Sequence, residues 1–406
     1  MAVGLTGLSK LLPVDGIRLS AVNAGIKQTE RADVVLIEIA EGAKTAAVFT
    51  QNAFCAAPVI VAREFLESMS PRFLLINSGN ANAGTGDKGL IYAYLCCESL
   101  AAAANCQSAR ILPFSTGVIG ELLPVTKILD QFTSLLDMLS ADSWAEAAHG
   151  IMTTDTVAKG LSRQIEIDGQ KITVTGIAKG SGMIRPDMAT MLAYIATDAA
   201  LSQDLLQHCL ESAVSSSFNS ITIDGDTSTN DACVLMATGK STLPEITDIT
   251  SKEYTLLEKA VKEVCEYLAA SIIRDGEGST KFVTIEVFEG QSEAECREVA
   301  YTVAQSPLVK TALFASDPNW GRILAAVGRA GIANLDVDLI SIYLGEVCIV
   351  RKGGRAAEYT ESAGVDVMAD DEITIRINLG RGDAQARIWT NDLSYDYVRI
   401  NAEYRT

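Results

Sequence analysis

The chain has 406 residues, 48% of them hydrophobic, which is more than a single hydrophobic core usually serves, so we expect at least two packed units. Its 33 lysines and arginines are outnumbered by 51 aspartates and glutamates, and the formal net charge of -18 disfavours nucleic acid and anionic membranes as partners. The two histidines, His149 and His208, are too few and too far apart for an H-x-x-x-H zinc site or a Ser-His-Asp triad. An enzyme with this sequence must find its general base elsewhere.

The cysteines and the N-terminal segment indicate the compartment. Nine cysteines without a C-x-x-C pair are typical of reduced thiols. Pro13, Asp15 and Arg18 interrupt the apolar run near the N-terminus, which disfavours a secretory signal. No apolar stretch approaches the length that spans a membrane. We therefore expect a cytoplasmic protein with no membrane partner.

Apolar periodicity predicts a mixed α/β first unit. In chain order, its predicted strands are 34–39, 46–50, 73–76, 111–114, 164–167, 171–177, 191–196, 232–237 and 281–287. The predicted helices are 88–104, 142–150, 203–217 and 252–273. A turn at 115–120 follows the fourth strand, and Asp168-Gly169 turns a hairpin between the fifth and sixth.

A second unit is predicted to begin near Gln291. Helices are expected at 291–303 and 323–330, and strands at 339–344, 372–378 and 386–390. This pattern is typical of a compact α+β domain. The predicted domains are therefore 1–290 and 291–406, and the absence of a Pro- or Ser-rich linker indicates that they pack against each other.

One threonine stands at an unusual junction. Residues 179–192 read K-G-S-G-M-I-R-P-D-M-A-T-M-L. Gly180, Gly182 and Pro186 give the approach to Thr190 unusual backbone preferences, and an apolar strand follows it. Loop strain could load the Ala189–Thr190 peptide bond while the strand holds the hydroxyl still. Alone, the pattern fits a structural threonine at a strand start better than a nucleophile.

Three further segments carry polar or glycine-rich patterns. Gly84, Gly86 and Gly89 spell G-x-G-x-x-G, but too far after the preceding strand for a dinucleotide-binding fingerprint, which favours a turn-rich loop lining a polar pocket. The segment 224–231, D-G-D-T-S-T-N-D, has Thr229 where a calcium loop needs glycine. Its better interpretation is a hydrogen-bonded turn. S-T-G at 115–117 is either an ordinary turn or an oxyanion hole, whose donors each contribute on the order of 3 kcal/mol.

Motifs along nearly the whole chain resemble the ornithine acetyltransferase family. They are N-S-G-N-A-N-A (77–83), S-T-G-V-I-G (115–120), T-T-D-T (153–156), K-G-S-G-M-I-x-P-x-M-A-T-M-L (179–192), D-G-D-T-S-T-N-D (224–231), G-E-G-S-T-K (276–281), S-D-P-N-W-G-R (316–322) and I-N-A-E-Y-R-T (400–406). None departs from the family pattern at a functional position.

The resemblance implies a fold and a self-processing reaction. The fold is a layered αββα-like sandwich with mixed sheets, of the N-terminal-nucleophile type, followed by a smaller C-terminal α+β domain. Cleavage between Ala189 and Thr190 gives an α chain (1–189) and a β chain (from 190), which assemble as an α2β2 heterotetramer. The freed α-amine of Thr190, with an ordinary pKa of about 7.7–8.0, can deprotonate its own hydroxyl. This solves the shortage of histidine.

The implied reaction is a ping-pong transfer of acetyl from N-acetyl-ornithine to glutamate through acetyl-Thr190, in arginine biosynthesis. Thr116 and Gly117 match the family's oxyanion hole. The family's substrate-binding positions correspond to Thr154, Lys179, Thr190, Glu277, Asn401 and Thr406. No metal or cofactor is implied. Some members of the family also use acetyl-CoA as a donor substrate, and the sequence does not distinguish those members from the ones that only recycle acetyl.

Without the resemblance, simpler interpretations hold. Lys179 and Glu277 would be solvated surface charges, and Asn401 and Thr406 a frayed tail. Two other functions stay open. One is hydrolysis, since related aminopeptidases use the same kind of nucleophile with water as acceptor. The other is non-catalytic binding of an amino acid or a nucleotide, which rests on the glycine pattern at 84–89.

Overall fold

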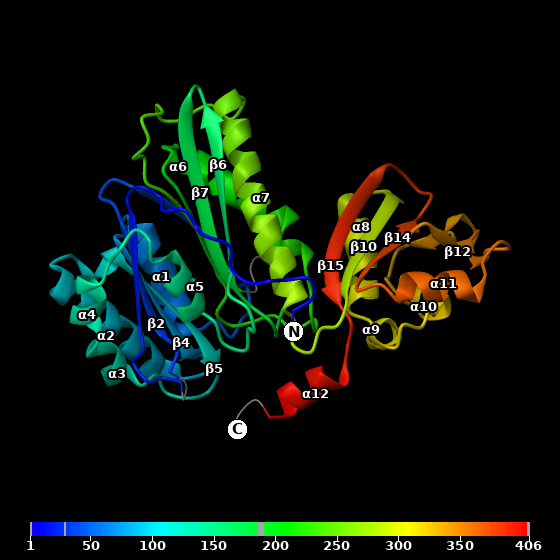
Figure 1. The fold of residues 1–406 in the computed structure, drawn as a ribbon, viewed down its shortest axis with the longest axis horizontal. Helices are drawn as coiled ribbons and strands as arrows, with labels where there is room; N and C mark the ends of the chain where they lie inside the picture. The colour runs from blue at the N-terminus through cyan, green and yellow to red at the C-terminus, as the bar shows by residue number, and fades with distance from the viewer. Residues whose placement is uncertain (1, 28–29, 186–190, 404–406) are drawn as a thin grey trace.

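The computed structural model describes residues 2–27, 30–185 and 191–403. Three sheets organise this part of the chain (Figure 1): a four-stranded sheet in the order β1-β2-β4-β5, a five-stranded sheet in the order β3-β9-β8-β7-β6, and a six-stranded sheet in the order β13-β12-β11-β14-β10-β15. Each contains both parallel and antiparallel neighbours.

The strands of the first two sheets are β1 (Ile17–Val22), β2 (Val34–Ile39), β3 (Lys44–Phe49), β4 (Phe73–Asn80), β5 (Ile111–Val118), β6 (Lys159–Ile167), β7 (Gln170–Lys179), β8 (Leu192–Thr197) and β9 (Ala232–Ala237). Their helices are α1 (Ala57–Ser68), α2 (Gly86–Ala104), α3 (Val125–Leu129), α4 (Phe132–Asp137), α5 (Trp144–Gly150), α6 (Gln203–Ser216) and α7 (Lys252–Arg274). Short 3-10 turns lie at Ser108–Arg110, Phe218–Ser220 and Val337–Leu339.

The third sheet has strands β10 (Phe282–Gly290), β11 (Ser341–Leu344), β12 (Val347–Arg351), β13 (Gly354–Arg355), β14 (Glu372–Asn378) and β15 (Ala384–Asn391). The helices of this part are α8 (Glu293–Ala304), α9 (Pro307–Phe314), α10 (Trp320–Gly328), α11 (Glu361–Met368) and α12 (Tyr395–Ala402).

The four- and five-stranded sheets lie face to face between layers of helices. Alternate residues of β8 point to opposite faces, as strand geometry requires. Tyr194 belongs to the core shared with the four-stranded sheet and packs edge-on against Phe114 of β5, with ring centroids 5.4 Å apart. Its neighbour Ile195 packs with α6 and α7 on the other side. Helices α1 and α2 lie against β5. The predicted αββα sandwich with mixed sheets is therefore confirmed.

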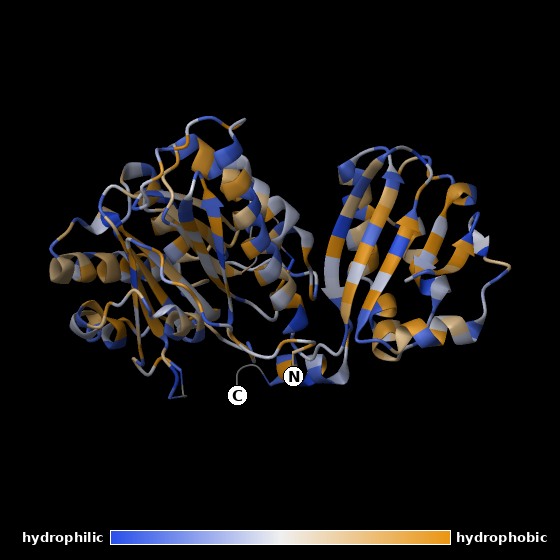
Figure 2. Ribbon diagram, turned by 45° about the horizontal axis from the view of Figure 1, so that its top comes forward, coloured by the Kyte–Doolittle hydropathy of each residue, from blue (hydrophilic) through white to orange (hydrophobic). Residues whose placement is uncertain are grey.

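The six-stranded sheet forms a separate layer with its own core (Figure 2). Inward residues alternate with more exposed ones along β14, and α8 covers β10 and β15. Polar and apolar residues visibly alternate along these strands, which is typical of a sheet with one buried face. Because β10 precedes Gln291 and pairs with β14 and β15, this sheet takes in a strand from before residue 290; the boundary at 290/291 stays a prediction.

The last helix, α12, leaves the six-stranded sheet and runs back beneath the sandwich (Figure 1). The hydroxyl of Ser394 caps it by accepting from the Tyr397 N–H at 3.3 Å and donates to the Gly278 carbonyl at 2.6 Å. None of its residues is buried. Tyr397 packs against the core around α6 and α7, and Tyr395 contacts Phe314 edge-on. The position of α12 therefore depends on both polar and partly exposed apolar contacts with distant segments.

The predicted turn at 115–120 was wrong in its first half, because β5 continues to Val118. Parallel pairing with β4 extends the strand through Thr116 and Gly117, with an irregularity at Gly79 and Asn80. Gly117 has φ +134, and a Cβ there would come within 2.3 Å of the Gly79 carbonyl carbon. Only glycine fits such an approach, so this position serves close backbone packing as well as any chemistry.

Candidate active site

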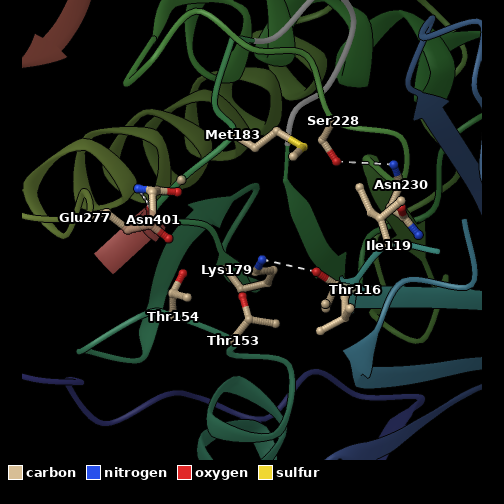
Figure 3. Close-up of a pocket in the computed structure, with 13 residues that line it drawn as sticks. Thr116, Ile119, Thr153, Thr154, Lys179, Met183, Ser228, Asn230, Glu277 and Asn401 are labelled. Atoms are coloured by element: carbon tan, nitrogen blue, oxygen red, sulfur yellow. Dashed lines mark hydrogen bonds between the residues drawn. The ribbon is translucent and has the colours of Figure 1, made fainter. Parts of the chain in front are cut away.

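A cavity of about 240 Å³ opens where the two facing sheets, the end of α7 and α12 meet (Figure 3). The described residues that line it are Thr116, Gly117, Val118, Ile119, Thr153, Thr154, Lys179, Gly182, Met183, Ser228, Asn230, Glu277 and Asn401. They come from segments that are distant in sequence, and the fold brings six of the predicted site residues together here: Thr116, Gly117, Thr154, Lys179, Glu277 and Asn401.

A lysine and a threonine meet across the two sheets on one side of the cavity. Lys179, the last residue of β7, donates from Nζ to Oγ1 of Thr116 in β5 at 3.2 Å. Because an ammonium only donates, the Thr116 hydroxyl is the acceptor and its own proton can be given to another group. Burial lowers the pKa of Lys179 from its usual value, although the carboxylates of Asp155 and Asp231 oppose this shift. The pair presents positive charge and a hydroxyl donor to the cavity.

A carboxylate and an amide lie together on another side. Asn401 of α12 donates from Nδ2 to Oε2 of Glu277 at 2.8 Å. Glu277 is 7% exposed and follows the end of α7, and its N–H donates to the Ser181 carbonyl at 2.7 Å. A Cβ on Gly182 would come within 2.4 Å of the Glu277 carboxylate. Glycine at 182 therefore lets the carboxylate approach the backbone.

The loop between α5 and β6 closes a third side. The hydroxyls of Thr154 and Ser181 share a hydrogen bond of 2.7 Å. The neighbouring N–H of Thr153 donates to Oδ2 of Asp155 at 3.0 Å. Thr153 and Thr154 are thus held by side chains from their own loop and from the segment that follows Lys179.

A buried charge cluster lies beneath these three sides. Lys159 Nζ donates to Asp155 Oδ1 and to Asp275 Oδ2, both at 2.7 Å, and all three side chains are at most 1% exposed. The N–H of Gly180 also donates to Asp155 Oδ1 at 2.7 Å. Burial disfavours the ionised form of Asp155, but the ammonium groups of Lys159 and Lys179 outweigh it and hold the pKa of Asp155 well below its usual range.

This cluster fixes the positions of pocket residues. The Asp155 carboxylate accepts hydrogen bonds from the backbone N–H groups of Thr153 and Gly180, which lie in two different segments. Asp275 caps the end of α7, two residues before Glu277, and accepts from the N–H groups of residues 156 and 157 at 3.0 and 3.2 Å. One lysine therefore links the three segments that carry Thr154, Lys179 and Glu277.

The far wall is formed by the segment before β9. Asn230 Nδ2 donates to the carbonyls of Ala81 and Ser115, at 2.5 and 2.9 Å, and the Asn230 N–H donates to Ser228 Oγ at 3.2 Å. These bonds tie this segment to the loop after β4 and to the strand that carries Thr116. Burial raises the pKa of the adjacent Asp231 well above its usual value.

Three of the predicted site residues, Ala189, Thr190 and Thr406, lie outside the described residues. Several lining residues were not singled out individually from the sequence, among them Thr153, Ile119, Met183, Ser228 and Asn230. All five fall inside motifs that carried the family resemblance. Those motifs were therefore the available signal.

The glycines at 84, 86 and 89 do not line the cavity, contrary to the predicted loop role. Gly86 begins α2. Asn82 Nδ2 donates to the Gly89 carbonyl at 3.0 Å and Asn82 Oδ1 accepts from the Thr85 hydroxyl at 3.0 Å. The loop satisfies its own polar groups and has a structural use at the start of the helix.

A sequence model of the ArgJ family matches residues 18–406. The chain belongs to the ArgJ family. It is 59% identical to the arginine biosynthesis bifunctional protein ArgJ of Pseudomonas syringae pv. tomato and to that of Pseudomonas fluorescens, in each case over all of both chains. The family resemblance drawn from the motifs is thereby confirmed, and with it the prediction that the chain is an enzyme.

Two solved structures of similar proteins were compared with this chain. The structure of arginine biosynthesis bifunctional protein ArgJ from Bacillus halodurans is 37% identical, with a TM-score of 0.50, and the match covers 52% of this chain and 99% of that one. Ornithine acetyltransferase from Mycobacterium tuberculosis, solved with ornithine, is 32% identical over 46% of this chain and 98% of that chain, with a TM-score of 0.39.

Three further observations on this ArgJ-family chain concern metal binding, membrane-spanning helices and the cysteines. Within the described residues, no group of three or more His, Cys, Asp and Glu side chains is placed to hold a metal ion. No helix in this part of the chain has the length and apolar character needed to cross a membrane. All nine cysteines are unpaired, and seven of them are buried.

Proposed function

We propose that this chain is a self-cleaving acetyltransferase of arginine biosynthesis, which moves acetyl from N2-acetyl-L-ornithine to L-glutamate and releases L-ornithine and N-acetyl-L-glutamate. The observation that carries the proposal is the cavity of Figure 3, where Thr116, Lys179, Glu277 and Asn401 meet in a chain of the ArgJ family. It combines a hydroxyl donor, a cation and a carboxylate within one space.

The first proposed step is cleavage between Ala189 and Thr190. The Thr190 hydroxyl attacks the Ala189 carbonyl carbon, the C–N bond breaks as the nitrogen takes the hydroxyl proton, and an ester forms. Water then hydrolyses the ester, leaving a carboxylate on Ala189 and a free α-amine on Thr190. The matched Bacillus chain supports a cut near the middle: it corresponds to 52% of this chain, and residues 190–406 are 217 of 406, about 53%.

The freed amine would act as the general base for transfer. An α-amine with an ordinary pKa of about 7.7–8.0 can accept the Thr190 hydroxyl proton near neutral pH, whereas the amide nitrogen of an uncut chain cannot. The hydroxyl attacks the acetyl carbonyl, ornithine leaves with the proton on its nitrogen, and the glutamate amine then takes acetyl from the Thr190 ester. Cleavage is therefore a precondition for transfer.

Thr116 and Gly117 are proposed to stabilise the negative oxygen of each tetrahedral intermediate. The contact from Lys179 to Thr116 Oγ1 supports this role, because it leaves the Thr116 proton available for an oxyanion. The nearby ammonium adds favourable charge in a partly enclosed site, where electrostatic stabilisation is stronger than in water.

The two charges of the cavity suit amino-acid substrates. Lys179 can pair with a substrate carboxylate, and Glu277, oriented by Asn401, can pair with an amine. Thr154, Thr190 and Thr406 complete the proposed binding residues. Ornithine and glutamate each carry an α-carboxylate and an α-nitrogen, so a single site can serve both halves of a ping-pong cycle.

Mass spectrometry under denaturing conditions tests the cleavage. We expect two chains that begin at residues 1 and 190, and a single uncut chain for Thr190→Ala. An intact wild-type chain that still transfers acetyl would overturn the mechanism, as would a Thr190→Ala variant that is still cut. Thr190→Ser is the matched control, because it keeps a hydroxyl and should retain cleavage.

The alternative is hydrolysis by an N-terminal-nucleophile aminopeptidase or amidase, with water as the acceptor. Measuring N-acetyl-glutamate against free acetate, in the presence of N-acetyl-ornithine and glutamate, separates the two. Predominant N-acetyl-glutamate supports transfer, and predominant acetate supports hydrolysis.

Acetyl-CoA is proposed as a second donor, since two relatives that are 59% identical are named bifunctional. Incubation with acetyl-CoA and glutamate, without N-acetyl-ornithine, tests this directly. A cytoplasmic α2β2 heterotetramer is the proposed assembly. Light scattering of the purified protein, with intact-mass measurement of each chain, would give its stoichiometry.

A further inference from the structure

The segment before the proposed cleavage bond is fixed by one carboxylate. Asp224 accepts from the Met183 N–H at 2.7 Å through Oδ2 and from the Ile184 N–H at 2.9 Å through Oδ1. The Ile184 carbonyl in turn accepts from the N–H of Ile223 at 2.8 Å and from the hydroxyl of Thr222 at 3.0 Å. Residues 183 and 184 are therefore held by four hydrogen bonds to residues 222–224.

Met183 adopts a conformation that needs this support. Its φ is +56, a left-handed backbone region that is unfavourable for a residue with a Cβ. Its side chain is 40% exposed, whereas that of Ile184 is 2% exposed and belongs to the core around α6 and α7. Packing of the Met183 side chain does not explain the left-handed backbone, and the pair of hydrogen bonds to Asp224 offsets its cost.

The other end of the same stretch is held by the same part of the chain. The Met191 carbonyl accepts from the Ala232 N–H at 2.9 Å, and Leu192 then pairs with Ala232 as β8 begins beside β9. Residues 185–190 thus connect two anchor points, and both anchors are provided by residues 222–232.

We propose that Asp224 is a positioning residue for self-cleavage: by holding Met183 and Ile184, it anchors the described end of the segment that leads to the proposed cleavage bond. This inference rests on the proposed function. Asp224 touches no reacting atom and acts through the backbone of the anchor.

The test measures the rate of cleavage in chains labelled during cell-free synthesis and sampled over time on denaturing gels. Asp224→Ala removes both acceptors, and we expect cleavage about tenfold slower or more. Asp224→Asn keeps one acceptor oxygen and should be intermediate. Cleavage of Asp224→Ala at the wild-type rate would overturn the proposal.

Two matched controls test whether the effect of Asp224→Ala comes from the lost backbone anchor, from the lost charge or from the lost contact with α12. Asp226 is an exposed acid two residues away, and Asp226→Ala loses the same charge but keeps the backbone N–H that donates to Asp224 Oδ1 at 3.3 Å. Tyr397 donates to Asp224 Oδ2 at 3.3 Å from α12, and Tyr397→Phe removes only that contact. Both should cleave at the wild-type rate. An equal slowing in either control would overturn the assigned role.

A rescue variant tests the geometric cause. Glycine adopts positive φ without the penalty of a Cβ, so Met183→Gly in the Asp224→Ala background should restore cleavage by about threefold or more. A merely structural defect would not recover, and failure of rescue would count against the anchor. Urea unfolding of the same variants in an uncut Thr190→Ala background measures any general loss of stability.

The outcomes for the two proposals are distinct. If the wild-type chain stays uncut, the proposed function fails. If the wild-type chain is cut and Asp224→Ala is cut equally fast, only the role of Asp224 fails.

Discussion

Two buried lysines in this molecule have opposite surroundings. Lys159, beneath the cavity, is 2% exposed and lies between Asp155 and Asp275. Lys310, in α9 of the C-terminal layer, is 4% exposed and donates to neutral acceptors, Oγ1 of Thr390 at 3.0 Å and the carbonyl and Oδ1 of Asn391, the latter at 2.8 Å.

Their titration differs accordingly. Burial alone would lower the pKa of each ammonium group. Asp155 and Asp275 outweigh burial at Lys159, whose pKa is raised. At Lys310 burial prevails, and the pKa falls to about 7 despite the more distant Asp392 and Asp224. The partner, not the depth of burial, therefore decides whether a lysine stays charged in this fold.

The largest effect is expected from Lys159→Met. The change leaves Asp155 and Asp275 buried without their cation, which should lower the free energy of unfolding by about 3–5 kcal/mol. Acetyl transfer should fall too, because the segments of Thr154, Lys179 and Glu277 lose their common link. The loss of stability should shrink as the pH falls and protonates the unpaired carboxylates. Urea unfolding measures this loss, and a value below about 1 kcal/mol would contradict the importance of the ion pair.

Lys310→Met tests the other lysine through pH. The pKa of Lys310 is about 7 in the fold and about 10.4 in an unfolded chain, so between these values the unfolded chain binds the extra proton. The cost of burying this lysine is then full below pH 7 and disappears as the pH rises towards 10. Between pH 6 and 9 the stability of the wild type should rise by about 3 kcal/mol relative to the variant. Parallel pH curves from urea unfolding would refute this expectation.

Asn391→Asp would make Lys310 resemble Lys159. The Asn391 Nδ2 atom has no hydrogen-bond partner among the described residues, so exchanging it for oxygen sacrifices no contact there. The new carboxylate should raise the pKa of Lys310 and reduce the pH-dependent difference to about 1.5 kcal/mol. Asn334→Asp, at an exposed position, is the matched control and should leave the curve unchanged. An unaltered pH dependence in Asn391→Asp would argue against the inference that a carboxylate partner keeps a buried lysine charged.

The smallest effect is expected at an exposed ion pair between β6, which also carries Lys159, and α7, which Asp275 caps. Arg163 of β6 contacts Glu263 of α7 at 3.2 Å, and both side chains are 43% exposed. Water screens this pair, so Glu263→Gln should change the free energy of unfolding by less than about 0.5 kcal/mol. A change as large as that of Lys159→Met would show that burial is not what distinguishes the two pairs.

Local pattern predicted many of the elements. Apolar runs located β2 and β9, and the alternation of apolar residues located β14, at their observed bounds. The hairpin of β6 and β7 turns at Asp168 and Gly169, which both have positive φ. These elements were predictable because strand periodicity and turn conformation depend on residues that are neighbours in the sequence.

Two of the errors concern segments whose structure depends on distant contacts. Helix α12 has no buried residue, so no buried apolar face marks it in the sequence, and without the family resemblance Asn401 and Thr406 suggest a frayed tail. Strand β5 was ended too early, because the continuation through Thr116 and Gly117 is imposed by its neighbour β4. Local patterns do not report such pairing.

The sequence by itself determined the family, the strand and helix patterns, and the threonine at the junction after Lys179. Only the tertiary structure decided that Lys179 meets Thr116, 63 residues away, and that Asn401 meets Glu277, 124 residues away. It also decided that one buried lysine keeps its charge while another tends to lose it. The physical reason is that hydrogen bonds, burial and charge pairing act between atoms close in space, while sequence periodicity reports only the faces of single elements.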